Sequence, residues 1–124
     1  MLEENMEEQW QIGFISEFVY KEFMALPKEI KSKIYRILHL IKEEGLEEIG
    51  MPYIRHVRGK LWEVRATGRN VIARSLYVTV RGKRVVILRS FIKKTEETPP
   101  EEIQISLKRL KEYEGGLDNG FYSV

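Results

Sequence analysis

Residues 61–92 decide the fold, and they read LWEVRATGRNVIARSLYVTVRGKRVVILRSFI. Apolar and polar residues alternate in three runs, which is the period of a β-strand with one buried face. The breaks at 67–70 and 81–83 each contain a glycine flanked by polar residues, so they predict hairpin turns. The segment therefore predicts an antiparallel meander. Its three strands are 61–66, 71–80 and 84–92.

Before the meander, the chain predicts one strand and a helical hairpin. Residues 9–15 alternate like a strand. Ser16 suits the N-cap of a short helix that runs to about Leu26, and Pro27 suits the first turn of a second helix, where its missing N–H is unpaired in any case. The second helix ends at Gly45. Its apolar stripe is Ile30, Ile34, Ile37, Leu38 and Ile41.

After the meander, residues 98–101 (Thr-Pro-Pro-Glu) form a capping box that predicts the start of a last helix. Ile103, Leu107 and Leu110 make its apolar stripe, and the glycines at 115–116 end it. Residues 1–8 read as an acidic lead-in and residues 117–124 as a loose tail. We therefore expect a single α+β domain over residues 1–124, with a small antiparallel sheet, an N-terminal helical hairpin packed on it and a C-terminal helix.

Charge is distributed unevenly along the 124 residues. Residues 51–94 carry 12 Lys and Arg and one acid, Glu63, whereas the segments on either side are both net acidic. A basic block inside an acidic protein is typical of a site for a polyanion such as RNA. A basic face that binds no partner remains the alternative.

Several functional classes lack the residues they need. The absence of cysteine excludes disulfides, zinc fingers and thiol nucleophiles. The basic block offers one carboxylate and one histidine, too few to predict a metal site, and no glycine-rich phosphate loop is present. We expect no metal, no small-molecule cofactor and no membrane association. The acidic start and the absence of a long apolar run predict a cytoplasmic protein.

Arginines on the predicted strands are the strongest candidates for chemistry. Arg74 interrupts an apolar row on its strand, so its guanidinium requires an anion or a hydrogen-bond acceptor. An internal ion pair with Glu63 is one interpretation. In the other, Arg65 and Arg74 grip a phosphate, which suits the planar fork of guanidinium.

A ribonuclease that uses the RNA's own 2′-hydroxyl needs such parts. Arg65, Arg74, Lys93 and Lys94 are candidates for stabilising charge, and His56 or Tyr77 for moving protons. The candidate RNA-binding residues are Arg55, Arg58, Lys60, Arg89 and Phe91, the last as a surface on which a base stacks.

Four short motifs in order resemble the phage-derived Gp49-like proteins, which are grouped with the HigB toxins in the RelE/ParE superfamily. They are Leu-Trp-Glu-Val-Arg at 61–65, Ala-Arg-Ser-Leu-Tyr at 73–77, residues 86–95 (VILRSFIKKT) and Thr-Pro at 98–99. The resemblance covers roughly residues 10–113. It implies a metal-independent endoribonuclease that cleaves mRNA on the ribosome, neutralised by a helix-turn-helix antitoxin. It also implies that Arg65, Arg74, Lys93 and Lys94 correspond to the family's site residues.

One departure from the family pattern concerns residues 89–90. Many relatives carry His-Gly or His-Ala there, whereas this chain has Arg-Ser.

The sequence is compatible with three functional hypotheses. The first is the toxin of a type II toxin–antitoxin pair that cleaves mRNA. The others are a ParE-like inhibitor of DNA gyrase without nuclease activity and a non-toxic prophage RNA-binding protein.

Overall fold

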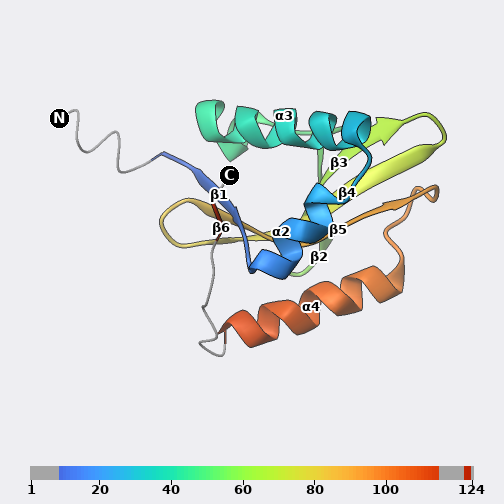
Figure 1. Cartoon of the computed structure of the whole chain (residues 1–124). Helices are drawn as coiled ribbons and strands as arrows, with labels where there is room; N and C mark the ends of the chain where they lie inside the picture. The colour runs from blue at the N-terminus through green and yellow to red at the C-terminus, as the bar shows by residue number, and fades with distance from the viewer. Residues whose placement is uncertain (1–8, 115–121, 124) are drawn as a thin grey trace.

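A mixed sheet lies between helices on both of its faces (Figure 1). The computed structural model describes residues 9–114 and 122–123, so the predicted lead-in 1–8 and most of the predicted tail lie outside them. The six strands are ordered β2-β3-β4-β5-β1-β6. In chain order the elements are β1 (Gln11–Phe14), α2 (Glu17–Met24), α3 (Lys28–Glu44), a 3-10 turn (Leu46–Glu48), β2 (Ile54–Arg58), β3 (Leu61–Gly68), β4 (Val71–Val80), β5 (Arg84–Lys93), α4 (Pro100–Glu114) and β6 (Tyr122–Ser123).

The α+β class and the antiparallel meander are confirmed. Strands β3, β4 and β5 pair antiparallel through the two predicted turns. Asn70 in the first turn and Gly82 in the second have positive φ, as tight hairpin turns require. The meander places Arg65 directly opposite Arg74, and Arg74 directly opposite Phe91.

Three pairings extend the sheet beyond the predicted meander. Strand β2 forms a hairpin with β3 and becomes one edge of the sheet. Strand β1 pairs parallel to β5, so the sheet is mixed rather than purely antiparallel. Residues 122–123 of the predicted tail form β6, which pairs with β1. Pairings of β1 join residues far apart in the sequence, which alternation within one strand does not reveal.

Local signals at the helix boundaries are confirmed for the helical hairpin. The Ser16 hydroxyl accepts a hydrogen bond from the Val19 amide at 3.2 Å, as an N-cap does. Helix α3 begins after Pro27, and Gly45 follows its last residue with φ of 96°. That conformation favours glycine, which explains why the helix ends there.

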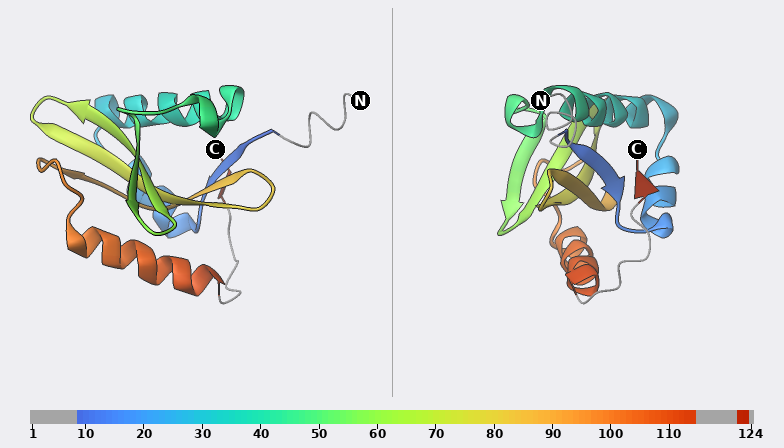
Figure 2. Two further views of the ribbon diagram at one scale, coloured as in Figure 1. Left: turned by 180° about the vertical axis from the view of Figure 1, so that it is seen from behind. Right: turned by 90° about the vertical axis from the view of Figure 1, so that its left-hand side faces the viewer.

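The helices cover opposite faces of the sheet. Side chains of α2 and α3 pack on one face around a cluster that includes Phe14, Tyr77 and Ile87. On the other face, Ile103 of α4 packs against a second cluster that includes Leu76 and Phe91. The end-on view in Figure 2 shows α3 and α4 on either side of the sheet. The apolar stripe of α4 predicted that it packs, but not on which face.

A bulge in β5 sets which side chains meet α4. Leu76 pairs with Arg89, and the next residue, Tyr77, pairs with Ile87, so Leu88 has no partner opposite it. Leu88 therefore joins the α4-side cluster, while the neighbouring Arg89 reaches Glu102 of α4.

Candidate nucleic-acid interface

Two buried arginines and one glutamate form an ion cluster on the α4 face of the sheet. Glu63 and Arg74 are 1% and 0% exposed, and Arg65 is 8% exposed. The Arg65 Nε donates to Glu63 Oε2 at 3.0 Å, and the Arg74 Nε lies 3.7 Å from Glu63 Oε1. The internal ion pair is therefore present. We call Arg65 and Arg74 the arginine pair.

Residues 94–99, here called loop 94–99, supply the other oxygen atoms of this cluster. The Glu96 carbonyl accepts hydrogen bonds from Arg65 Nη2 and from Arg74 Nη2, the latter at 2.7 Å. Arg74 Nη2 also donates to the Thr95 carbonyl. The Glu96 carboxylate lies 3.3 Å from Arg65 Nη1, and the Thr98 hydroxyl donates to Glu63 Oε1 at 2.7 Å. Thr98 therefore ties the loop to the sheet rather than capping the helix, because Pro99 occupies the position before α4 and its carbonyl accepts from the Glu102 and Ile103 amides.

Burial leaves Arg74 in an unusual environment. Its Nε and Nη1 atoms are buried and have no hydrogen-bond partner. Loss of water lowers the pKa of Arg74, Glu63 opposes that shift, and the neighbouring charge of Arg65 adds to it. Arginine remains protonated in proteins. The fold thus holds a positive charge that its surroundings only partly satisfy.

A second ion network joins α2, β5 and α4, and we call it the inter-helix network. Arg89 donates to Glu102 at 2.6 Å and to Glu22 at 2.9 Å. Arg109 donates to the same Glu22 at 2.7 Å and to the Leu88 carbonyl at 2.7 Å. Burial by itself lowers the pKa of Arg89, but the hydrogen bonds and charges of Glu102 and Glu22 outweigh it and raise that pKa.

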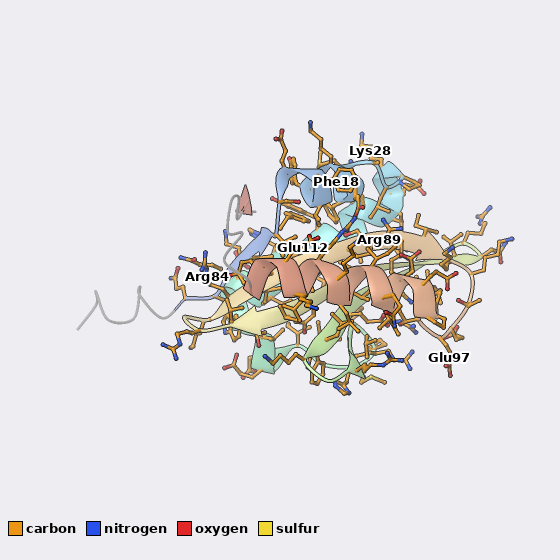
Figure 3. The ribbon with its side chains drawn as sticks, turned by 90° about the horizontal axis from the view of Figure 1, so that it is seen from below. Phe18, Lys28, Arg84, Arg89, Glu97 and Glu112 are labelled. Atoms are coloured by element: carbon orange, nitrogen blue, oxygen red, sulfur yellow. The ribbon has the colours of Figure 1, made fainter. Side chains whose placement is uncertain are left out.

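Arg89 was predicted to bind RNA. In the structure its guanidinium is instead held by Glu102 and Glu22 in the inter-helix network. Figure 3, seen from the α4 side, shows Arg89 beside α4 on the side toward α2. Phe91 is 6% exposed within the α4-side cluster, and the guanidinium carbons of Arg74 and Arg89 each lie 5.9 Å from its ring centre. A base therefore has no access to the Phe91 ring in this conformation.

The edge strand β2 and its turn keep the other predicted RNA-binding residues near the surface. Arg58 and Lys60 are exposed and Arg55 is half-buried, and we call these three residues the basic edge. A hollow of about 360 Å³ separates β2 from loop 94–99. Its lining includes Arg55, Arg58, His56, Glu63, Glu96 and Thr98. The hollow brings Arg55 and Arg58 of the basic edge up to the ion cluster, whereas Lys60 lines a different hollow, beside Trp62.

His56 and Tyr77, both predicted to move protons, lie in different environments. His56 is exposed, its Nε2 lies 2.8 Å from the Gly59 carbonyl, and its ring meets Trp62 edge to face at 4.9 Å. Tyr77 is 1% exposed on the α3 face, across the sheet from the arginine pair. Burial raises the pKa of the Tyr77 phenol above its usual range. The prediction for Tyr77 is therefore corrected: it is a core residue that does not reach the candidate site.

Lys93 and Lys94 are exposed where β5 ends and loop 94–99 begins. Lys94 lines a second hollow, of about 400 Å³, together with Glu96 and the β3–β4 turn. Lys94 thus lines a different hollow from the one that Arg55 and Arg58 line.

A family model described as phage derived protein Gp49-like matches residues 21–111. The chain belongs to that family. No curated protein matches it. The matched segment of this Gp49-like protein contains the arginine pair, Glu63, loop 94–99, the basic edge and the inter-helix network.

Two other kinds of feature, a membrane-spanning helix and a metal-binding cluster, are absent from the described residues. No described helix has the length and the apolar character needed to cross a membrane. Over residues 9–114 and 122–123, no three His, Asp or Glu side chains gather in a way that could hold a metal ion.

Four contributors to these clusters escaped the sequence analysis. Glu22 and Arg109 are 87 positions apart and meet only because α2 and α4 approach the same strand. Glu96 and Glu102 lie in ordinary acidic stretches, so their residue types carried no distinguishing signal. An unpaired arginine in an apolar row was a signal for Arg74, and it led to the correct partner, Glu63.

Proposed function

We propose that this Gp49-like protein is the toxin of a type II toxin–antitoxin pair and that it cleaves ribosome-bound mRNA without a metal ion. One observation carries the proposal. Two guanidinium groups lie side by side on adjacent strands, and their donors converge on one oxygen, the Glu96 carbonyl. Phosphate oxygens bind such a pair of guanidinium groups in the same manner. The adjoining basic edge supplies charge that attracts RNA.

The proposed reaction needs no nucleophile from the protein. The RNA's 2′-oxygen attacks the neighbouring phosphorus, the bond to the 5′-oxygen breaks, and the products end in a 2′,3′-cyclic phosphate and a 5′-hydroxyl. Stabilising the charge that develops on the phosphoryl oxygens is the role proposed for Arg65 and Arg74. Strand pairing places the His56 ring with Trp62 and Tyr77 on the sheet face opposite the arginine pair, so solvent is the proposed acceptor of the 2′-hydroxyl proton and the proposed donor of a proton to the leaving 5′-oxygen.

The proposed partners are the ribosome, its mRNA and a helix-turn-helix antitoxin. Support for them comes from the family and from the basic edge, whose residues are accessible to a large polyanion. The exposed Trp62 ring beside His56 offers an aromatic surface at the same edge, on which an unpaired base can stack.

The test is to induce the protein in bacterial cells and to map new mRNA 5′ ends. We expect cuts at a fixed position within translated codons. The triple variant Arg55→Gln/Arg58→Gln/Lys60→Gln is expected to lose most of them, since it removes the charges at the basic edge. A matched variant with the same charge change on exposed helical residues, Lys28→Gln/Arg36→Gln/Lys108→Gln, is expected to cut like the parent. Equal cutting by both variants would reject the basic edge as the mRNA site.

A non-cleaving RNA-binding protein is the second candidate. The observation in its favour is that loop 94–99 and Glu63 already hold the arginine pair, while Tyr77 lies on the far face of the sheet. Ribosome or mRNA binding without new 5′ ends would support this function over cleavage. Growth arrest without cuts and with altered DNA supercoiling would instead indicate gyrase inhibition.

A further inference from the structure

Loop 94–99 covers the arginine pair with its own oxygen atoms. The Glu96 carbonyl accepts from both arginines, the Thr95 carbonyl accepts from Arg74, and the Glu96 carboxylate faces Arg65. Each contact occupies a guanidinium N–H group that could otherwise donate a hydrogen bond to an RNA phosphate. The closed loop and a bound phosphate therefore exclude one another at these donors.

Only a few contacts hold the loop closed. Residues 94–97 are exposed, and the Glu96 side chain is 81% exposed. An ion pair with so exposed a carboxylate contributes little to stability. The Thr98 hydroxyl bond to Glu63 is a second attachment. Opening the loop therefore exposes little apolar surface, and the three guanidinium bonds to the Thr95 and Glu96 carbonyls that it breaks are bonds that a phosphate can replace.

The inter-helix network fixes the far end of the loop. Arg89 holds Glu102 in the first turn of α4, while Arg109 and Glu22 secure the same helix further along. Figure 3 shows Glu97 in the segment that leads into this end of α4. Because α4 and β5 are held in place at its two ends, a displacement of the loop would be confined to residues 94–99.

Arg74 keeps hydrogen-bond donors without acceptors while the loop covers it. Its Nε and Nη1 atoms are fully buried without hydrogen-bond partners. Buried polar donors normally find partners, and leaving them without any destabilises a fold. An incoming phosphate, which has more acceptor oxygens than one carbonyl, can satisfy donors that the loop leaves unpaired.

We infer that loop 94–99 is an autoinhibitory strap, which occupies the arginine pair in the unbound protein and is displaced when an RNA phosphate binds. This inference rests on the proposed function, because it takes the arginine pair to be the phosphate site. It adds that affinity for RNA is set by competition with the protein's own Glu96.

Two neighbouring variants test the competition. Glu96→Gln removes the carboxylate that faces Arg65, whereas Glu97→Gln removes an adjacent exposed carboxylate and changes the net charge equally. The probe is a single-stranded RNA oligomer with 2′-O-methyl groups, which cannot be cleaved. We expect Glu96→Gln to bind it about two- to five-fold more tightly than Glu97→Gln does, the range for loss of an exposed ion pair.

A second measurement observes the arginines directly. In NMR spectra of the wild-type protein, the Nε–H signals of Arg65 and Arg74 are expected to shift when the oligomer is added. Equal affinities for the two variants, or no binding by any form, would overturn the strap, and so would arginine signals that stay unchanged. Because no cleavage is measured, the strap can fail while cuts in cells still support the toxin, and the reverse also holds.

Discussion

Replacing Glu63 with Gln tests how strongly the ion cluster holds the sheet together. The Glu63 carboxylate is 1% exposed and lies within 3.0 Å of Arg65, 2.7 Å of Thr98 and 3.7 Å of Arg74. Glutamine keeps the size of the side chain and one acceptor oxygen but removes the negative charge. Two buried guanidinium groups then lose their only buried carboxylate among the described contacts.

The expected loss follows from that burial. Removing one partner of a buried ion pair costs about 3–5 kcal/mol. Because the amide oxygen still accepts a hydrogen bond, we expect the lower end, about 3 kcal/mol of the free energy of unfolding. That is a large part of the roughly 5–15 kcal/mol typical of a domain and corresponds to a melting temperature lower by about 10 °C.

Urea unfolding followed by circular dichroism and by tryptophan fluorescence measures this loss. Glu97→Gln is the matched control, since it makes the same chemical change at an exposed position three residues before the first residue of α4, and it is expected to stay within about 0.5 kcal/mol of the parent. A loss below about 1 kcal/mol for Glu63→Gln would refute the role given to the cluster.

Three further predictions concern the rest of the molecule. Arg89→Gln leaves Glu102 and Glu22 without their shared partner and should cost about 1.5–3 kcal/mol, with faster amide hydrogen exchange in α4; unchanged exchange there would contradict the network. The Tyr77 phenol has a raised pKa when folded and ionises near pH 10 when unfolded, so its contribution is complete below about pH 10 and falls at higher pH; Tyr77→Phe should make the alkaline loss of stability shallower, by up to about 1.4 kcal/mol per pH unit, and identical pH profiles would argue against its burial. Replacing the three basic-edge residues with Gln should reduce the slope of log affinity against log salt for single-stranded RNA by about 2, and an unchanged slope would mean that RNA binds elsewhere.

Much of the fold was predictable because its signals are local. Alternation in residues 61–92 predicted the meander, and Ser16 and Gly45 marked helix boundaries that the structure confirms. The side of the sheet on which α4 lies was not predictable, since Ile103 and its apolar neighbours specify burial and not a partner face. The parallel pairing of β1 with β5 is likewise a consequence of tertiary packing.

The sequence predicted which residues form the candidate site, but not that loop 94–99 covers the arginine pair. Arg74 in an apolar row signalled a buried cation, and Glu63 was a correct candidate for its partner. Nothing in the sequence indicated that the carbonyls of residues 95 and 96 would cover the arginine pair, because main-chain acceptors leave no trace in residue type. The period of β4 places Tyr77 and Arg74 on opposite faces, so that separation was available from the sequence.

Cleavage by the purified protein on programmed ribosomes tests the central claim most directly. Ribosomes are stalled on a defined mRNA with one codon in the A site, and the RNA products are analysed at nucleotide resolution. We predict a cut within that codon, ending in a 2′,3′-cyclic phosphate, which disappears when the nucleotide before the cut lacks its 2′-hydroxyl and when ribosomes are omitted. Intact mRNA on ribosomes that demonstrably bind the protein would contradict the account and leave a non-cleaving RNA-binding protein.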